Sequence, residues 1–196
     1  MRGERRAFAD RLYAQSSAHD AAQADRLARW RNVEPETASL LGVLVRAIGA
    51  RRVLEIGTSN GYSTIWLADA AEAVGGRVLS LEMLPERSAA AAQHLRDAGL
   101  ADVVELRTQD AAEALAHFEA ESWDFVFLDA ERPAYAGYWP DLVRVLAQPG
   151  VLVVDNVISH AAEVADLRAL VEADERVVAS LVPIGAGALV VARAPG

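Results

Sequence analysis

Short runs of β-branched and apolar residues alternate with alanine-rich stretches over most of this chain. The runs lie at 52–56, 77–81, 103–106, 124–128, 151–154, 177–181 and 188–191. The first five are expected to be buried strands, because they are apolar throughout rather than alternating, as parallel strands covered on both faces are. The stretches between strands have helical spacing, which predicts strand–helix–strand crossovers. The sequence therefore predicts an α/β fold with a doubly wound sheet.

The expected helices follow the strands in order, at 62–73, 85–98, 111–118, 135–146 and 161–173. Only residues 183–187 separate the last two runs, which is too short for a crossover helix. These two runs are therefore predicted to form an antiparallel hairpin.

Residues 1–33 are expected to form an N-terminal helical segment that faces the substrate, and residues 34–196 the main domain. Glu34-Pro35-Glu36 marks the start of the next helix, with proline early and acids in the first turn. Neither a signal peptide nor an apolar stretch long enough to span a membrane is recognisable. A cytoplasmic protein without a membrane partner is therefore expected.

The charge balance and two missing residue types exclude several kinds of chemistry. The net charge is −9, from 19 basic and 28 acidic residues, which disfavours nucleic acid as a partner. The sequence contains no cysteine, so it has no disulfide framework, thiol nucleophile or cysteine zinc site. Every basic residue is arginine, which excludes a Schiff-base lysine and a lysine general base.

Ligands of doubly wound sheets bind at the carboxyl ends of the strands, so the residues that end each run are the candidates for a site. The first run leads into a glycine-containing turn with the spacing Gly57-x-x-x-Gly61. This spacing lacks the middle glycine of a dinucleotide-binding turn, which favours a ligand without a pyrophosphate. A tight strand–helix turn without a ligand is the alternative.

Two acidic residues follow the next two runs. Glu82, at the end of the second, could accept hydrogen bonds from both hydroxyls of a ribose, or could be a solvated surface residue. The apolar run before Glu82 favours the first interpretation. Asp110, after the third run, could contact an adenine amino group or cap the helix that follows, and the sequence leaves both open.

Asp129 follows the fourth run, and the pair Asp155-Asn156 follows the fifth. Because these two strands are expected to be adjacent and parallel, the three side chains should converge at one edge of a cleft. Such oxygen ligands suit Mg²⁺ or a similar divalent cation, the alternative being that each caps a helix or turn. His160, four residues beyond Asn156, is interpreted as a surface residue rather than a base.

Together these motifs resemble the cation-dependent O-methyltransferases, a family that includes the catechol and caffeoyl-CoA O-methyltransferases. The resemblance extends from about Glu34 to the end of the chain. It is carried by Glu55-Ile56-Gly57-Thr58-x-x-Gly61-Tyr62-Ser63, Glu82, Phe127-Leu128-Asp129-Ala130 and Asp155-Asn156-Val157. It implies a Rossmann-like class I methyltransferase fold with a seven-stranded, mostly parallel sheet, an antiparallel last strand and helices on both faces.

The resemblance also implies roles for individual residues. The turn would hold the methionine part of S-adenosylmethionine, Glu82 its ribose, and Asp110 and Ala111 would lie near the adenine. The full set of implied cofactor-binding residues is Glu55, Gly57, Thr58, Gly61, Tyr62, Ser63, Glu82, Asp110, Ala111 and Asp129. Asp129, Asp155 and Asn156 would hold Mg²⁺ or another divalent cation, which would hold two vicinal oxygens of the substrate.

One position departs from the family's pattern. The family reads Asp-Ala-Asp-Lys after the fourth strand, where the lysine is often assigned as the base, and this chain reads Asp129-Ala130-Glu131-Arg132. Arginine stays protonated and cannot abstract a proton. The expected catalytic residues are Arg132 and Asp129, with Arg132 stabilising the substrate oxyanion while water, Glu131 or His160 takes the proton.

The expected function is transfer of a methyl group from S-adenosylmethionine to a hydroxyl of a small catechol-like substrate, assisted by a divalent cation. One alternative keeps the fold but acts on a hydroxylated nucleoside of tRNA, which the acidic balance disfavours. Another is a non-catalytic S-adenosylmethionine-binding protein, which Arg132 keeps open. The expected partner is a small hydroxylated aromatic molecule, and a homodimer also remains open.

Overall fold

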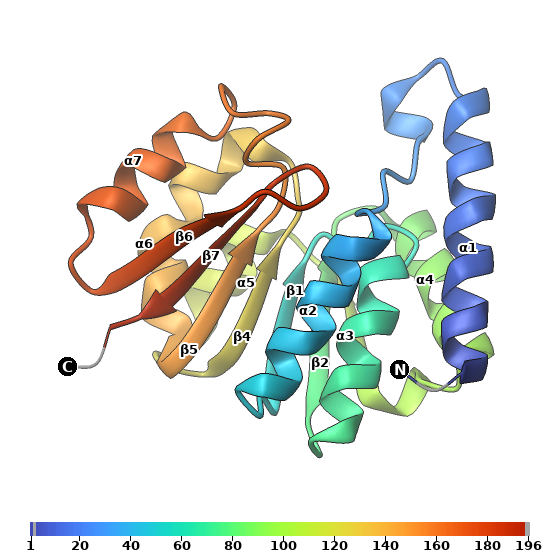
Figure 1. The fold of residues 1–196 in the computed structure, drawn as a ribbon, viewed down its shortest axis with the longest axis horizontal. Helices are drawn as coiled ribbons and strands as arrows, with labels where there is room; N and C mark the ends of the chain where they lie inside the picture. Colours follow the sequence, from blue (N-terminus) through green and yellow to red (C-terminus); the bar gives the residue numbers. More distant parts are fainter. Residues whose placement is uncertain (2, 195–196) are drawn as a thin grey trace.

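The computed structural model describes residue 1 and residues 3–194, and it contains one mixed sheet between two layers of helices (Figure 1). The seven strands pair in the order β3-β2-β1-β4-β5-β7-β6. Their bounds are β1 Arg52–Ile56, β2 Arg77–Glu82, β3 Val104–Thr108, β4 Trp123–Leu128, β5 Leu146–Val154, β6 Val177–Val182 and β7 Ala188–Arg193. The predicted sheet, with seven strands and helices on both faces, is confirmed.

The helices alternate with the strands, as the periodicity predicts. Their bounds are α1 Gly3–Ala22, α2 Pro35–Ala47, α3 Tyr62–Ala73, α4 Pro85–Asp97, α5 Ala111–His117, α6 Tyr135–Val145 and α7 Ala165–Ala173. Short 3₁₀ turns lie at Arg26–Ala28, Ala101–Val103 and Arg132–Ala134. Proline stands at the first position of α2 after Glu34, which agrees with the predicted helix start. Within the described chain no helix is both long and apolar enough to cross a membrane.

The strand order places the reversal of the sheet between β1 and β4. Strand β1 pairs in parallel with β2 on one side and with β4 on the other, and β4 pairs in parallel with β5. The chain therefore proceeds outward in both directions from β1 and β4, and the loops after these two strands separate to leave a crevice. The adjacency of β4 and β5, on which the predicted acidic cluster depends, is confirmed.

The predicted hairpin is also confirmed. Strand β7 is antiparallel to both of its neighbours, β5 and β6. It is inserted between them, so the last strand in the chain is not the last strand in the sheet.

Three expectations about individual elements are wrong. Strand β3 is not buried, because it is the edge strand and pairs only with β2, so Glu105 and Arg107 are exposed. Strand β5 begins at Leu146, directly after α6, rather than at Val151. The last helix begins at Ala165, and residues 157–164 form turns instead of its first residues.

Apolar side chains form one core on each face of the sheet. Helices α5, α6 and α7 cover one face, and α1, α2, α3 and α4 cover the other. Neighbouring residues of β1 point to opposite faces, so Leu54 contributes to the first core and Val53 to the second. Glu55 alternates in the same way and therefore points toward the face covered by α3.

Candidate active site

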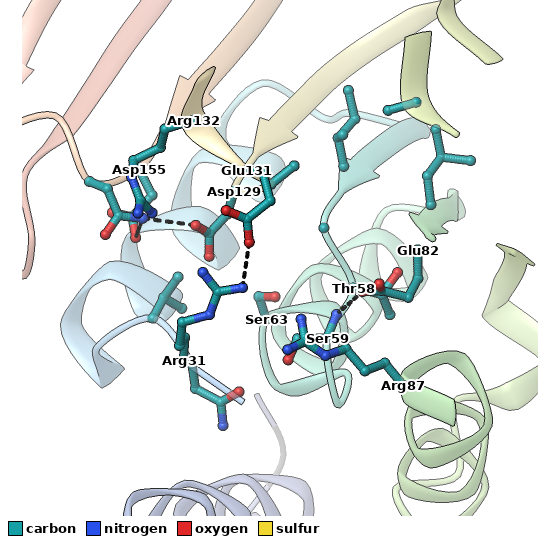
Figure 2. A pocket seen from close by; sticks show the side chains of 18 of the residues that line it. Arg31, Thr58, Ser59, Ser63, Glu82, Arg87, Asp129, Glu131, Arg132 and Asp155 are labelled. Carbon is teal, nitrogen blue, oxygen red and sulfur yellow. Dashed lines mark hydrogen bonds and ion pairs between the residues drawn. The ribbon is translucent and has the colours of Figure 1, made fainter. Parts of the chain in front are cut away.

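A cavity of about 280 Å³ lies at the carboxyl ends of β1, β2, β4 and β5. Four segments contribute most of its lining: residues 30–34, the turn 56–59 after β1, residues 81–83 at the end of β2, and residues 129–132 after β4. Asp155 and Asn156 close it on the β5 side, and Figure 2 shows Asp129 and Asp155 on one side of it and the β1 turn with Glu82 on the other. The predicted cleft at the strand ends is therefore present.

The turn after β1 is tight because it passes close to β4. Gly57 has φ +104°, and a Cβ atom there would lie 2.2 Å from the carbonyl oxygen of Asp129. Only glycine accepts that conformation and that approach together. Gly61 precedes α3 with φ +86° and packs against Ala91, whereas Tyr62 is buried against Tyr13 with ring centroids 5.3 Å apart.

Glu82 is 9% exposed and lines the cavity beside this turn. Its Oε2 accepts a hydrogen bond from the backbone N–H of Ser59 at 2.8 Å, and its Oε1 accepts from those of Met83 and Leu84, both at 3.0 Å. Three backbone donors therefore fix the carboxylate in place. A carboxylate has about four lone-pair sites, so Glu82 keeps acceptor capacity for a ligand hydroxyl.

Two residues that follow β3, Asp110 and Ala111, have different positions. Ala111 lines the cavity. The side chain of Asp110 accepts hydrogen bonds from the backbone N–H groups of Ala112 at 2.8 Å and Glu113 at 3.1 Å, so it caps α5. The cap is thus formed, and contact of Asp110 with an adenine stays a prediction.

Asp129, Asp155 and Asn156 meet as predicted, and they are called the acid–amide cluster below. Asn156 Nδ2 donates hydrogen bonds to Asp129 Oδ1 at 2.8 Å and to Asp155 Oδ2 at 3.2 Å. The backbone holds both aspartates in register, since Asp129 N–H donates to the Ile56 carbonyl at 2.9 Å and Asp155 N–H to that of Leu128 at 3.1 Å. The structure thus brings together the three residues that the sequence predicts as cation ligands.

Both carboxylates of the acid–amide cluster have a raised pKa. Burial, and next the charge of Asp155, raise the pKa of Asp129 well above its ordinary value, and burial raises the pKa of Asp155 to about 6. Asp155 Oδ1 is buried and has no hydrogen-bond partner among the described residues. A buried carboxylate oxygen without a donor is costly unless a cation or a ligand completes it.

The donor set fits a divalent cation that prefers oxygen. No three His, Cys, Asp or Glu side chains are grouped as a metal site within residues 1 and 3–194, so the two carboxylates need the amide as a third ligand. Asn156 would present its oxygen instead of its nitrogen after a half-turn of the amide group. Two carboxylates and one amide oxygen are the kind of ligands that Mg²⁺ accepts together with water.

Arg132 lies beside the acid–amide cluster and is only 5% exposed. Its Nε donates a hydrogen bond to Glu163 Oε2 at 2.8 Å, whereas its Nη2 is buried with no partner in the described part of the chain. This guanidinium therefore has a buried donor without a partner beside the acid–amide cluster. Such a donor is available for an anionic oxygen of a ligand.

The two side chains considered as proton acceptors differ in their surroundings. Glu131 is exposed and forms an ion pair with Arg31 Nη2 at 2.7 Å. His160 is half-buried and lines the cavity, with its Nδ1 2.8 Å from Ser159 Oγ. His160 therefore lies at the surface beside the cavity, in the turns at 157–164 that follow β5, and its role stays a prediction.

The segment from Trp30 to Glu34 lines the cavity, and sequence reasoning did not identify its individual residues. Asp20 holds it, since its carboxylate accepts hydrogen bonds from the backbone N–H groups of Trp30 at 2.7 Å and Arg31 at 2.8 Å. Ser59 Oγ also donates to the Trp30 carbonyl at 2.7 Å. This placement suits the substrate-facing segment predicted for residues 1–33. The division at residue 34 stays a prediction, and residues 195–196 lie outside the described residues.

Glu55 is fully buried and is not among the described residues that line the cavity. It accepts hydrogen bonds from three hydroxyls, those of Ser63 at 2.6 Å, Thr64 at 2.5 Å and Ser80 at 2.6 Å. Burial raises the pKa of Glu55 to about 7. The residue was predicted to bind a cofactor, and the structure places it one layer below the cavity floor, beneath Ser63.

Comparison with known proteins identifies the same family as the motifs. Residues 20–194 match the O-methyltransferase family. A catechol O-methyltransferase of Mycobacterium tuberculosis is 41% identical over 75% of this chain and 64% of that protein. A catechol O-methyltransferase of Niastella koreensis is 38% identical over 65% of this chain and 58% of that protein. The matched part of the chain thus spans about three-fifths of the length of these relatives.

Solved structures agree in fold. An O-methyltransferase from Bacillus cereus in complex with S-adenosylhomocysteine superposes with a TM-score of 0.80, at 27% identity over 96% of this chain and 91% of that one. An O-methyltransferase from Streptomyces achromogenes in complex with S-adenosylmethionine gives a TM-score of 0.75, at 29% identity over 84% and 82%. The predicted class I methyltransferase fold is therefore confirmed.

Proposed function

The chain belongs to the O-methyltransferase family, and we propose that it transfers a methyl group from S-adenosylmethionine to one hydroxyl of a small catechol-like substrate. A divalent cation held by the acid–amide cluster would assist the transfer. Membership of the family, and relatives of known structure with the cofactor or its product bound, support the methyl donor. The names of the two catechol O-methyltransferases support the class of acceptor.

One observation carries the proposal. A nucleoside-compatible carboxylate, Glu82, and the acid–amide cluster line the same cavity, and Figure 2 shows Glu82 beside Ser59 on one side of it with Asp129 and Asp155 on the other. Methyl transfer needs a donor and an acceptor aligned in one site, and alignment is most of what an enzyme contributes to such a displacement. The two sides of this cavity suit these two molecules.

The residues of the chain would bind and orient the reactants. Glu82 would accept hydrogen bonds from the ribose, and the turn at 57–59 would lie along the methionine part. When bound, S-adenosylmethionine would supply the methyl group, and a divalent cation would supply positive charge beside the acceptor oxygen. Asp129, Asp155 and Asn156 would hold that cation.

Arg132 would stabilise the ionised hydroxyl of the substrate rather than remove its proton. Its Nη2 is a buried donor without a partner among the described residues, and a guanidinium stays charged at any accessible pH. The substrate proton would then leave to water or to His160, which lines the same cavity. Glu131 is less suited to this task because it is exposed and paired with Arg31.

Two measurements test the proposal. Calorimetric titration should detect S-adenosylhomocysteine binding in the micromolar range, about −8 kcal/mol, and Glu82→Ala should weaken it by roughly 1–3 kcal/mol. Methyl transfer to catechol should be seen by chromatography of the monomethyl ether, and excess EDTA should abolish it. Failure to bind S-adenosylhomocysteine would exclude the methyl donor, whereas full activity in EDTA with no metal retained would exclude the cation.

A further inference from the structure

A second cavity, of about 370 Å³, lies at the amino ends of β1, β2, β3 and β4, and is called the basal cavity below. These strands are parallel, so the basal cavity lies at the opposite end of them from the candidate active site. The two cavities share no lining residue. Cavities that bind small molecules measure about 300–1,000 Å³, so the basal cavity is large enough for a ligand of its own.

Three arginines, Arg51, Arg52 and Arg77, are crowded together in the lining. Arg52 and Arg77 stand opposite each other on neighbouring strands, which lie about 4.8 Å apart, and like charges in this relation repel. The backbone also holds Arg51 beside Arg77, because the Arg77 N–H donates to the Arg51 carbonyl at 2.8 Å. Gly76 allows this approach, since a Cβ atom there would lie 2.6 Å from the Arg51 Cα.

Only one of the three arginines is paired with a carboxylate. Asp124 accepts hydrogen bonds from Arg52 Nε at 3.1 Å and from Arg52 Nη2 at 2.5 Å. Burial acts against the positive charge of Arg52, but the hydrogen bonds from Arg52 to Asp124 are the larger cause and raise the Arg52 pKa. The charge of Arg52 is therefore offset inside the protein.

Arg77 and Arg51 have no such partner. Arg77 Nη1 donates to the Asp102 carbonyl at 2.8 Å, and Arg77 forms no ion pair with a described residue. The exposed side chain of Arg51 forms neither a hydrogen bond nor an ion pair within the described chain. Glu105, the acidic residue of the lining, is paired with Arg107 at 2.6 Å. Two positive charges thus remain at this cavity, in a protein whose net charge is −9.

The lining indicates the chemistry of a ligand. Guanidinium groups bind oxyanions through charge-assisted hydrogen bonds, and a phosphate monoester, with a charge of about −2, matches two of them better than a single carboxylate does. Trp123 is half-buried in the same lining and presents an aromatic surface. Flat heterocycles stack on such surfaces whatever their identity.

We propose that the basal cavity binds a phosphate monoester that carries a flat ring, as a nucleoside monophosphate does. Arg51 and Arg77 hold the phosphate group, and Trp123 contacts the ring. The ligand offsets the repulsion between the arginines, which is the physical reason for its binding. The inference does not depend on methyl transfer, because the basal cavity is separate from the candidate active site.

Calorimetry with three probes tests the two parts of the ligand. Uridine monophosphate should bind at about pH 8 and low ionic strength, where its phosphate is a dianion and screening is weak. Uridine, which lacks the phosphate, should bind at least about 10-fold more weakly, the usual effect of losing a hydrogen bond to a charged group. Inorganic phosphate, which lacks the ring, should also bind about 10-fold more weakly.

Two variants remove the charges that carry the inference. Arg51→Gln and Arg77→Gln should each weaken uridine monophosphate by about 10-fold, and both positions are exposed, so the fold should be kept. Arg168→Gln is the matched control, because it removes the same charge from an arginine of α7 that is paired with Glu172 at 3.6 Å and lies outside the basal cavity. It should stay within about twofold of the wild type.

A third variant tests the ring contact. Trp123→Leu should weaken uridine monophosphate by about 10-fold and leave inorganic phosphate unchanged. Equal weakening of both probes would show that Trp123 only supports the fold, and would overturn its contact with the ring.

Three results would overturn the inference as a whole. They are a wild-type protein that does not bind uridine monophosphate, equal affinities for uridine and its monophosphate, and a loss of affinity in Arg31→Gln but not in Arg51→Gln. The last result would place the nucleotide in the candidate active site, which Arg31 lines. Binding of S-adenosylhomocysteine should be equal in wild type, Arg51→Gln and Arg77→Gln, so a failure of the proposed function is measured separately.

Discussion

Two regions of the protein that each bury an aspartate differ in their surroundings. Asp69, on α3, is 4% exposed and is paired with Arg46, with Arg5 at 3.1 Å and with the N-terminal amine at 3.4 Å. Burial acts to raise its pKa, but the hydrogen bonds from Arg46 and Arg5 bring the pKa below the ordinary value. Asp155, at the end of β5, is 2% exposed, and its Oδ1 has no partner among the described residues.

This difference separates a structural acid from a candidate functional one. Removing a partner from a buried ion pair destabilises a protein, whereas a buried carboxylate held without enough donors already opposes folding. Asp69 should therefore contribute to stability and little to activity. Asp155 should contribute to activity and nothing to stability. Replacement by asparagine should therefore lower activity at Asp155 and stability at Asp69.

The largest expected effect is on activity. Asp155→Asn should lower kcat/KM for catechol methylation by about 1,000-fold, roughly 4 kcal/mol, because it removes a charged ligand of the proposed cation. Thermal unfolding should show equal or greater stability, since a neutral amide relieves the repulsion from Asp129. A variant with near wild-type kcat/KM would remove Asp155 from the site.

Asp69 should also respond to pH in the opposite way to Glu55, another buried carboxylate. Burial raises the pKa of Glu55 to about 7, so its stabilising contribution is full below about pH 4.5 and is lost as the pH rises through 7. Asp69, with a lowered pKa, contributes above about pH 4 and loses that contribution as the pH falls. Glu55→Gln should therefore flatten the decline in unfolding free energy between pH 5 and 8, by at most about 3 kcal/mol.

Urea unfolding at a series of pH values measures this effect. The difference between wild type and Glu55→Gln should change with pH mainly between 5 and 8, and Asp69→Asn should show no change in that window. An equal pH slope in wild type and Glu55→Gln would show that Glu55 does not titrate there.

Asp69→Asn should have a smaller effect, and on stability alone. The change removes the charge that pairs with Arg5 and Arg46, and should lower the free energy of unfolding by about 2 kcal/mol. Asp166→Asn, on an exposed site of α7, is the control and should stay within about 0.5 kcal/mol of the wild type. A loss of kcat in folded Asp69→Asn would contradict the division between the two regions.

The smallest effect concerns the arginines of the two regions. All three nitrogens of the Arg5 guanidinium donate hydrogen bonds within the fold, whereas Arg132 Nη2 has no partner in the described chain. Arg132→Met should lower kcat by about 10-fold, or 1.4 kcal/mol, and Arg132→Lys should keep most of it because a positive charge remains. Equal rates for wild type and Arg132→Met would place Arg132 outside the reacting centre.

Much of the fold and of the candidate site could be predicted because their signals are local. Period and length of the apolar runs indicate strands and helices, and the short connection before β7 requires a hairpin. Strand ends of a parallel sheet share one edge, which is why Asp129, Asp155 and Asn156 could be placed together from their positions in the sequence. The matching family confirms the resemblance drawn from those motifs.

What the sequence by itself determined is therefore the order of the elements and the edge at which the acidic residues gather. The tertiary structure alone decided that β3 lies at the sheet edge and that Arg31 reaches Glu131, a residue 100 positions away, because such contacts depend on how distant segments pack. It also decided that Glu55 lies beneath the cavity rather than in it. The side chains of β1 alternate between two faces, and only the packing of α3 on one of them shows which hydroxyls meet that carboxylate.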